Sequence, residues 1–166
     1  MATHINVILE VKEIVFDIQN KAFLIGQARE AEGTNYEAAS NMQVCDDEEN
    51  SYQIRRSLTT AFAQLKSMLG EYINNTSTLS NNKLDCSIDI NGTLALDLNV
   101  PNNFNTASID VLGSVIHDYL VDKSLADWFA INSKSDADIY LSRSIVDLDI
   151  IKRALNKRNR PERPKY

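Results

Sequence analysis

The sequence has few of the residues on which most enzyme chemistry depends. Its 166 residues include two histidines, two cysteines and five glycines. The glycines form no Gly-rich phosphate loop, and neither histidine has a second histidine or a cysteine at ligand spacing. No catalytic motif is present, so we expect a protein that is not an enzyme and that needs no metal and no cofactor.

Long apolar runs are missing as well. No stretch approaches the roughly 20 apolar residues of a transmembrane helix, so we expect no membrane contact. The N-terminal segment has no basic region and carries Glu10 and Glu13, unlike a secretory signal peptide. Cys45 and Cys86 fit a reducing compartment, with Cys86 as a small core residue. An apolar share of 43% and a charged share of 24% are typical of one soluble globular domain.

The polar residues that remain allow two chemical interpretations. His117 stands beside Asp118 in a predicted helix, with Asp110 two turns earlier, and such a pair can orient a base or hold a metal. We favour a histidine at a helix surface or an interface. The acidic run 46–49 resembles a calcium loop but lacks the alternation and the glycine of one. It suits a helix N-terminus better.

Apolar residues spaced by three and four predict four long helices. The first covers about 5–30 and ends near Gly33, although the β-branched residues at its start suit a short strand equally well. After a polar loop over 33–50, with a short helical turn at 36–43, a second and antiparallel helix runs from 47 or 51 to 73. A third begins near Thr106 or Ser108, and serines at 133 and 135 mark the start of a fourth. Trp128 and Phe129 are expected in the core.

Residues 84–100 are the one stretch in which the apolar period changes from 3.6 to 2. Two alternating runs flank Asn91-Gly92, a pattern that is typical of a β-hairpin. A two-residue loop there would place the two apolar rows on opposite faces. A three-residue loop, with Gly92 in the left-handed region, instead pairs Ile88 with Leu94 and keeps the rows on one face. The same register pairs Cys86 with Leu96 and Leu84 with Leu98.

The polar face of the predicted hairpin is a candidate contact surface. It carries three aspartates, and the predicted register places Asp85 opposite Asp97. Carboxylates in this arrangement can bind a cation, keep the face hydrated or meet basic residues of a neighbour. The predicted partner-binding residues of the hairpin are Asp85, Asp89, Asn91, Gly92 and Asp97.

These elements predict a mainly α protein: an antiparallel helical bundle of about four helices with one inserted β-hairpin. The bundle spans residues 1–156. A lone hairpin is marginal in water and must lie on helices or join another chain. The first helix also carries more apolar residues than one antiparallel partner covers. The predicted oligomer-interface residues are Ile14, Phe16, Phe23 and Leu24.

Charge is distributed unevenly along the chain. From Lys152 onward there are seven basic residues and one glutamate, a charge of +6, so the preceding residues carry −12 of the total of −6. Residues 157–166, with two prolines, are predicted to form an extended arm. Its charge suits an acidic partner, either a neighbouring copy or DNA. The predicted contact residues of the arm are Lys157, Arg158, Arg160, Pro161, Arg163, Pro164 and Lys165.

The order of long helix, long helix, hairpin, helix, helix and basic arm resembles the head-to-tail connector, or neck ring, proteins of tailed bacteriophages. Residues 117–164 are similar to ring proteins of crAss-like phages and their relatives that infect gut Bacteroidetes. The similarity at residue level lies at Asp127-Trp128-Phe129 and over 157–161. In that family, antiparallel helices carry a protruding hairpin and many copies form a ring beneath the portal.

The resemblance implies a structural virion protein. It would be made in the host cytoplasm and assemble as a homo-oligomeric ring in the neck, linking head to tail and extending the DNA channel. Its partners would be the portal, other neck or tail proteins, and DNA passing through without sequence preference. Two other classes remain open on the sequence: a cytoplasmic adaptor or regulator that binds a protein through its hairpin and helix faces, and a small enzyme or metal protein around His117.

Overall fold

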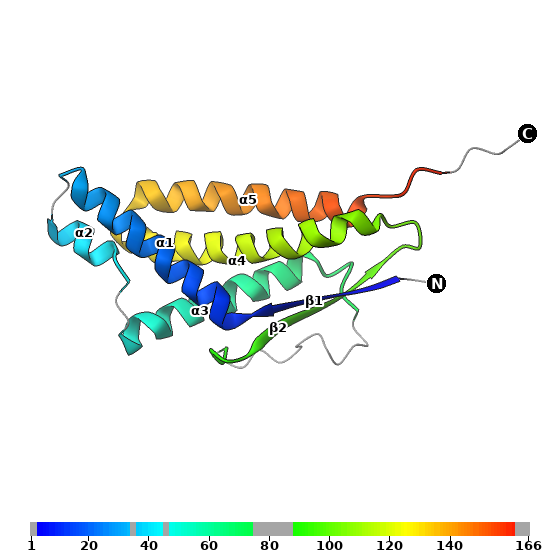
Figure 1. Cartoon of the computed structure of the whole chain (residues 1–166), viewed down its shortest axis with the longest axis horizontal. Coiled ribbons are helices and arrows are strands. Elements are labelled where there is room, and N and C mark those ends of the chain that lie inside the picture. Colours follow the sequence, from blue (N-terminus) through cyan, green and yellow to red (C-terminus); the bar gives the residue numbers. More distant parts are fainter. Residues whose placement is uncertain (1–2, 34–35, 45–46, 75–87, 162–166) are drawn as a thin grey trace, which may run out of the picture.

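The computed structural model describes residues 3–33, 36–44, 47–74 and 88–161 and is mainly helical (Figure 1). Within these ranges the sheet has two antiparallel strands, and a short 3-10 turn over Thr106–Ser108 precedes the fourth helix. The strands are β1 (Thr3–Glu10) and β2 (Thr93–Val100). The helices are α1 (Val11–Ala31), α2 (Tyr36–Met42), α3 (Glu48–Met68), α4 (Ile109–Asn132) and α5 (Lys134–Asn156).

The helix ends follow local chemistry. Gly33 has a φ of 78°, a left-handed conformation that suits glycine just after a helix, and α1 ends there as predicted. Ser133 separates α4 from α5, which confirms the predicted new start. Helix α4 begins directly after Ser108, as predicted, but the Ser108 side chain makes no capping hydrogen bond, and the side-chain cap belongs to the 3-10 turn before it. The side chain of Asn105 accepts a hydrogen bond from the Ala107 amide at 3.0 Å.

Helix α4 is the centre of the fold, between α5 and α3 in Figure 1. It contacts α1, α2, α3, α5 and β1. A helix that is apolar on most of its circumference must be covered on most sides. Its buried residues accordingly point in several directions. They are Leu112, Ile116, Tyr119, Leu120, Val121, Asp122, Ser124, Leu125, Ala126, Trp128 and Phe129.

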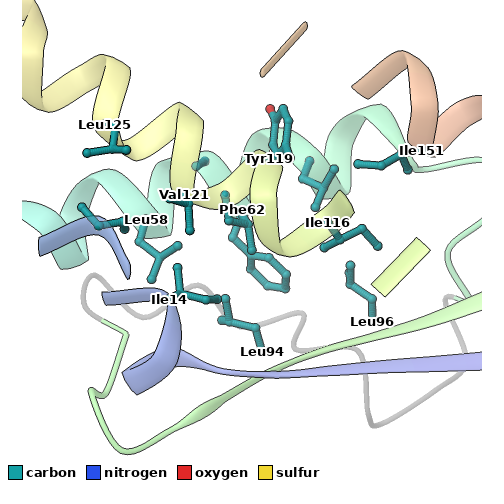
Figure 2. Packing of buried hydrophobic residues seen from close by; sticks show 14 of the residues in the cluster. Ile14, Leu58, Phe62, Leu94, Leu96, Ile116, Tyr119, Val121, Leu125 and Ile151 are labelled. Carbon is teal, nitrogen blue, oxygen red and sulfur yellow. The ribbon is translucent and has the colours of Figure 1, made fainter. Parts of the chain in front are cut away.

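A single core joins every element. Figure 2 shows Ile14 of α1, Phe62 of α3 and Val121 of α4 converging above the apolar row of β2. The predicted core position of Trp128 is confirmed, since its indole is buried and Nε1 donates to the Met42 carbonyl at 3.1 Å. Helix α1 crosses the other helices obliquely in Figure 1, and α3 packs mainly on α4 rather than on α1, its predicted antiparallel partner.

The two-stranded sheet pairs the start of the chain with its middle. Strand β2 carries the predicted apolar row, but the predicted pairing of Ile88 with Leu94 is wrong because Leu94 lies opposite Leu9. The strand alternative at the start of the first predicted helix is the one observed. In the same register Leu96 lies opposite Val7 and Leu98 opposite Ile5. The predicted partners Leu84 and Cys86 lie outside the described residues.

Residues 88–92, directly before β2, form a turn rather than a strand. The Gly92 amide donates to the Asp89 carbonyl at 2.9 Å, and the Asn91 amide donates to Oδ1 of Asp89 at 3.2 Å. Gly92 does not have the predicted positive φ. Its carbonyl accepts a hydrogen bond from the Val11 amide at 3.1 Å, so the turn is attached to the first residue of α1.

The other edge of β2 is partly covered by the chain that follows α3. The Asn99 amide donates to the Tyr72 carbonyl at 2.6 Å, and the Asn74 amide donates to the Asp97 carbonyl at 2.9 Å. Ile73 forms an isolated bridge with Leu98. Leu96, Asp97 and Leu98 are buried in succession, because the two leucines face the core and the side chain of Asp97, on the other face, lies against Asn74 and His4.

Leu98→Ala should therefore destabilise the protein by about 2–5 kcal/mol, because the lost side chain is fully buried between the sheet and the helices. Ile8→Ala is the matched control, since Ile8 is 61% exposed on the adjacent strand and its loss should cost less than about 1 kcal/mol. Urea unfolding followed by circular dichroism measures both. Equal effects of the two substitutions would contradict the observed facing of the sheet.

Candidate interface surfaces

The predicted contact residues of the hairpin do not form one surface. Asp89 and Asn91 are exposed in the turn and Gly92 is half-buried. Asp97 is 6% exposed, a correction to its predicted place on a hydrated face. It accepts a hydrogen bond from Nδ2 of Asn74 at 3.0 Å, and His4 Nδ1 lies 3.7 Å from its other carboxylate oxygen. Asp85 lies outside the described residues.

The start of the predicted arm is attached to its own chain. The Asn105 amide donates to the Lys157 carbonyl at 3.1 Å, and the Asn159 amide donates to the Asn103 carbonyl at 2.7 Å. Arg158 Nη1 donates to the Leu155 carbonyl at 2.7 Å and so closes the end of α5. The part able to reach a partner thus begins at Arg160, which is exposed together with Pro161. Arg163, Pro164 and Lys165 lie outside the described residues.

Three of the four predicted interface residues on α1 are exposed. Phe16 is 64% exposed, Phe23 41% and Leu24 53%. Ile14 departs from the prediction, because its side chain is fully buried in the core of the same chain. Phe16 and Phe23 are seven residues apart and share one side of the helix, whereas Leu24 lies about a quarter turn away.

Helix α5 has a further apolar surface that sequence reasoning did not identify. It packs chiefly against α4, so much of its circumference faces outward. Leu141 and Ile145 follow one flank at a spacing of four, and Ile139 and Val146 follow the opposite flank at a spacing of seven. All four are at least 40% exposed. We call these the two apolar flanks of α5. A polar ridge of Asp138, Ser142 and Asp149 separates them.

Charged side chains of α1, α4 and α5 lie close together where these three helices pack against one another. Lys21 Nζ of α1 lies 3.8 Å from Oδ1 of Asp122, which is 6% exposed on α4. Asp147 of α5 is close enough to Asp122 for their charges to interact, and both are also influenced by Arg143 of α5. We call these groups, with Asp17, Arg29, His117, Asp118 and Asp136, the polar seam.

Burial first, and then the nearby carboxylates of Asp122 and Asp118, raise the pKa of Asp147 to about 6 against the opposing charges of Lys21 and Arg143. Within the described part of the chain, its buried Oδ2 accepts no hydrogen bond. Burial likewise raises the pKa of Asp122, although Lys21 and Arg143 oppose the shift. The seam thus holds carboxylates that are costly to ionise.

The seam is fastened at one end by the contact of Arg29 with Asp136. Nη2 of Arg29 donates to Oδ1 of Asp136 at 2.7 Å, and Ser133 Oγ donates to Oδ2 at 2.7 Å. Burial raises the pKa of Asp136, but these hydrogen bonds and the Arg29 charge outweigh it and hold that pKa below its ordinary value. The contact joins the last turn of α1 to the first turn of α5.

His117 lies at the other end of the seam. Its Nε2 is 3.4 Å from Oδ2 of Asp17 and its Nδ1 is 3.8 Å from Oδ1 of Asp118, so the predicted pair with Asp118 is one of two. Asp110, which was predicted to lie on nearly the same face of the helix, forms no ion pair with His117 among the described residues. His117 also borders a surface hollow of about 670 Å³, whose other lining residues are Glu10, Lys12, Glu13, Phe16 and Asp17.

A larger groove of about 780 Å³ lies between the first half of α3 and the last turns of α4. Its lining combines carboxylates with an exposed aromatic ring: Glu48, Glu49, Tyr52, Gln53, Arg56, Ser57, Asp127 and Ala130. Burial raises the pKa of Asp127, and the charge of Lys123 lowers it. Sequence reasoning assigned the acidic residues to a helix start, which is correct, but could not reveal the facing wall of α4.

Comparison with protein-family models found no match. Comparisons with curated proteins and with solved structures found none either. Among the described residues, no three His, Cys, Asp or Glu side chains are grouped to hold a metal ion. No described helix is long and apolar enough to span a bilayer.

Arg29→Met should destabilise the protein by about 1–2 kcal/mol, because it leaves the Asp136 carboxylate buried without its cation. Arg153→Met removes an ion pair of similar geometry to Asp149, but both of those side chains are more than half exposed. That control should change stability by less than about 0.5 kcal/mol. Thermal unfolding measures the stability of both variants. An equal loss of stability in the two would show that the contact of Arg29 with Asp136 stabilises the protein no more than an exposed ion pair does.

Asp147→Asn should stabilise the protein by about 1 kcal/mol near neutral pH, after allowance for the partial exposure of the carboxylate. With a folded pKa of about 6 against 3.8 when unfolded, the folded state holds more protons between these values. The contribution of Asp147 to the stability of the wild type is therefore complete below the unfolded pKa of 3.8 and is lost as the pH rises through the folded pKa of about 6. The Asp147→Asn variant should lack this pH-dependent loss.

Denaturation from about pH 4 to pH 7 tests this, with Asp138→Asn as an exposed control on the same helix. A constant stability difference between the wild type and Asp147→Asn across this range would contradict the assignment.

Proposed function

We propose that this protein is a structural subunit of an oligomeric ring in the head-to-tail connector of a tailed bacteriophage. In this role it lies in the virion neck beneath the portal, extends the DNA channel and contacts neighbouring neck or tail proteins. We also propose that α1, α3, α4 and α5 correspond to the antiparallel helical bundle of that family. The support comes from the order of elements and from the surface chemistry described above.

The apolar flanks of α5 are the observation that carries the proposal. Monomeric proteins expose single apolar side chains, but apolar residues aligned along both sides of one helix favour two separate contacts. Two different contact faces on one chain give a heterologous interface, which closes into a ring when the rotation between copies fits. The exposed residues of α1 extend the surface available for such contacts.

The residue-level resemblance at Asp127-Trp128-Phe129 and over 157–161 supports the same role. Two residues of this resemblance, Trp128 and Phe129, are buried on α4, so this part of the resemblance concerns the fold and not the surface. Its basic part begins at the end of α5 and continues beyond the last backbone contact at Asn159. A chain whose body is acidic and whose C-terminal segment is basic can make a directional contact from one copy to the next.

Ile145→Glu combined with Val146→Glu should abolish assembly, because each substitution places a carboxylate on a different apolar flank. Gln64→Glu with Ser67→Glu is the control, since it adds carboxylates to two exposed positions on α3, a helix that carries neither flank. We expect the wild type to form closed rings by mass photometry and electron microscopy, the control to match it, and the flank variant to be a helical monomer by circular dichroism.

A wild-type chain that remains monomeric at high concentration and binds a heterologous protein would instead favour the adaptor. Electron microscopy of the native assembly tests the location. Labelled copies should lie at the neck of the particles, and their absence from purified virions would contradict the connector role.

A further inference from the structure

We propose that the groove between α3 and α4 receives the basic C-terminal arm of a neighbouring copy of this chain. The proposal deepens the connector function above, because it assigns one specific contact between adjacent subunits. The occupant is the segment from Arg160 to Tyr166, and the receiving residues are Glu48, Glu49, Tyr52 and Asp127.

Charge complementarity supports this occupant. The groove has three carboxylates and one guanidinium, Arg56, in its lining. None of the three carboxylates has a salt-bridge partner among the described residues. An arginine fits a carboxylate in a two-point hydrogen-bonded arrangement that few other side chains can make. Arg160 and Arg163 can supply two such contacts.

The spacing of residues in the arm matches the chemistry of the groove. A polyproline II segment has three residues per turn, so Pro161 and Pro164 would form one ridge and Arg160 and Arg163 another. Proline-rich segments of this kind bind grooves with aromatic walls. Tyr52 is 53% exposed and lines the groove. A volume of about 780 Å³ is sufficient for a short peptide.

The arm cannot reach the groove of its own chain. Asp127 and Ala130 lie in the last turns of α4, beside the start of the antiparallel α5, whereas the arm leaves from the end of α5 (Figure 1). The 23 residues of α5 span roughly 34 Å. Asn159 is the last described residue whose backbone is hydrogen-bonded to the rest of the chain, and a segment of the seven residues that follow it can span at most about 24 Å. A second copy is therefore the donor.

The test uses a fluorescent peptide of residues 157–166 and the full chain with Arg160→Glu and Arg163→Glu, so that its own arm does not compete. We expect saturable binding that weakens at least about tenfold when Glu48→Arg and Glu49→Arg are added. A peptide with Pro161→Ala and Pro164→Ala keeps the charge and should bind more weakly. Absence of saturable binding, or binding unaffected by the groove substitutions, would overturn the proposal.

Assembly of the full chain gives an independent readout. Reversing charge in the arm or in the groove should weaken ring formation, and combining both reversals should restore it. Lys152→Glu with Arg153→Glu changes the net charge of α5 equally, outside the arm, and should leave assembly unchanged. Rings that persist after arm reversal would refute the arm contact while leaving the connector function standing. A loss of DNA binding alone would identify nucleic acid as the target of the arm.

Discussion

The burial of α4 is the constraint on which the rest of the structure depends. From Leu112 to Phe129 this helix presents apolar side chains in nearly every direction, so no single partner can remove them from water. The other helices and the sheet each cover part of it. Because α5 follows after one residue, it must return antiparallel along α4, and its own far side is left without cover. The exposed flanks of α5 are thus a consequence of where the chain places its most apolar helix.

The polar seam restricts how the helices are oriented relative to one another, which apolar packing alone does not do. Burial of apolar area is nearly indifferent to small rotations of one helix over another, whereas a buried carboxylate needs a donor at a defined distance. Asp136 accepts hydrogen bonds from two donors, whereas Asp122 forms an ion pair with Lys21 at 3.8 Å, beyond hydrogen-bond distance. Asp147 Oδ2 accepts no hydrogen bond within the described part of the chain, and burial with the nearby carboxylates raises the pKa of this group to about 6.

Sequence patterns predicted much of the helical part. The three-four spacing located α3, α4 and α5, because a helix shows its apolar face in its own sequence. The break at Ser133 was predicted from serines followed by aspartates, which suit a helix start. Alternation located β2 in the same way. The partner of β2 could not be read from alternation, since the residues before Asn91 and those of β1 have equally suitable apolar rows. Asp97 was misplaced for the same reason: a hydrated face was assumed where Asn74 and His4 lie.

The sequence by itself determined the apolar periodicity of each segment, the breaks between helices, and the separation of charge between an acidic body and a basic end. These depend on residues that are neighbours in the chain, so local geometry is enough to read them. Only the tertiary structure decided that β1 pairs with β2, that Glu48 and Asp127 share one groove, and that α5 has two uncovered flanks. Each of these joins residues more than twenty positions apart or depends on which surfaces remain after packing. Periodicity within one segment carries no information about either.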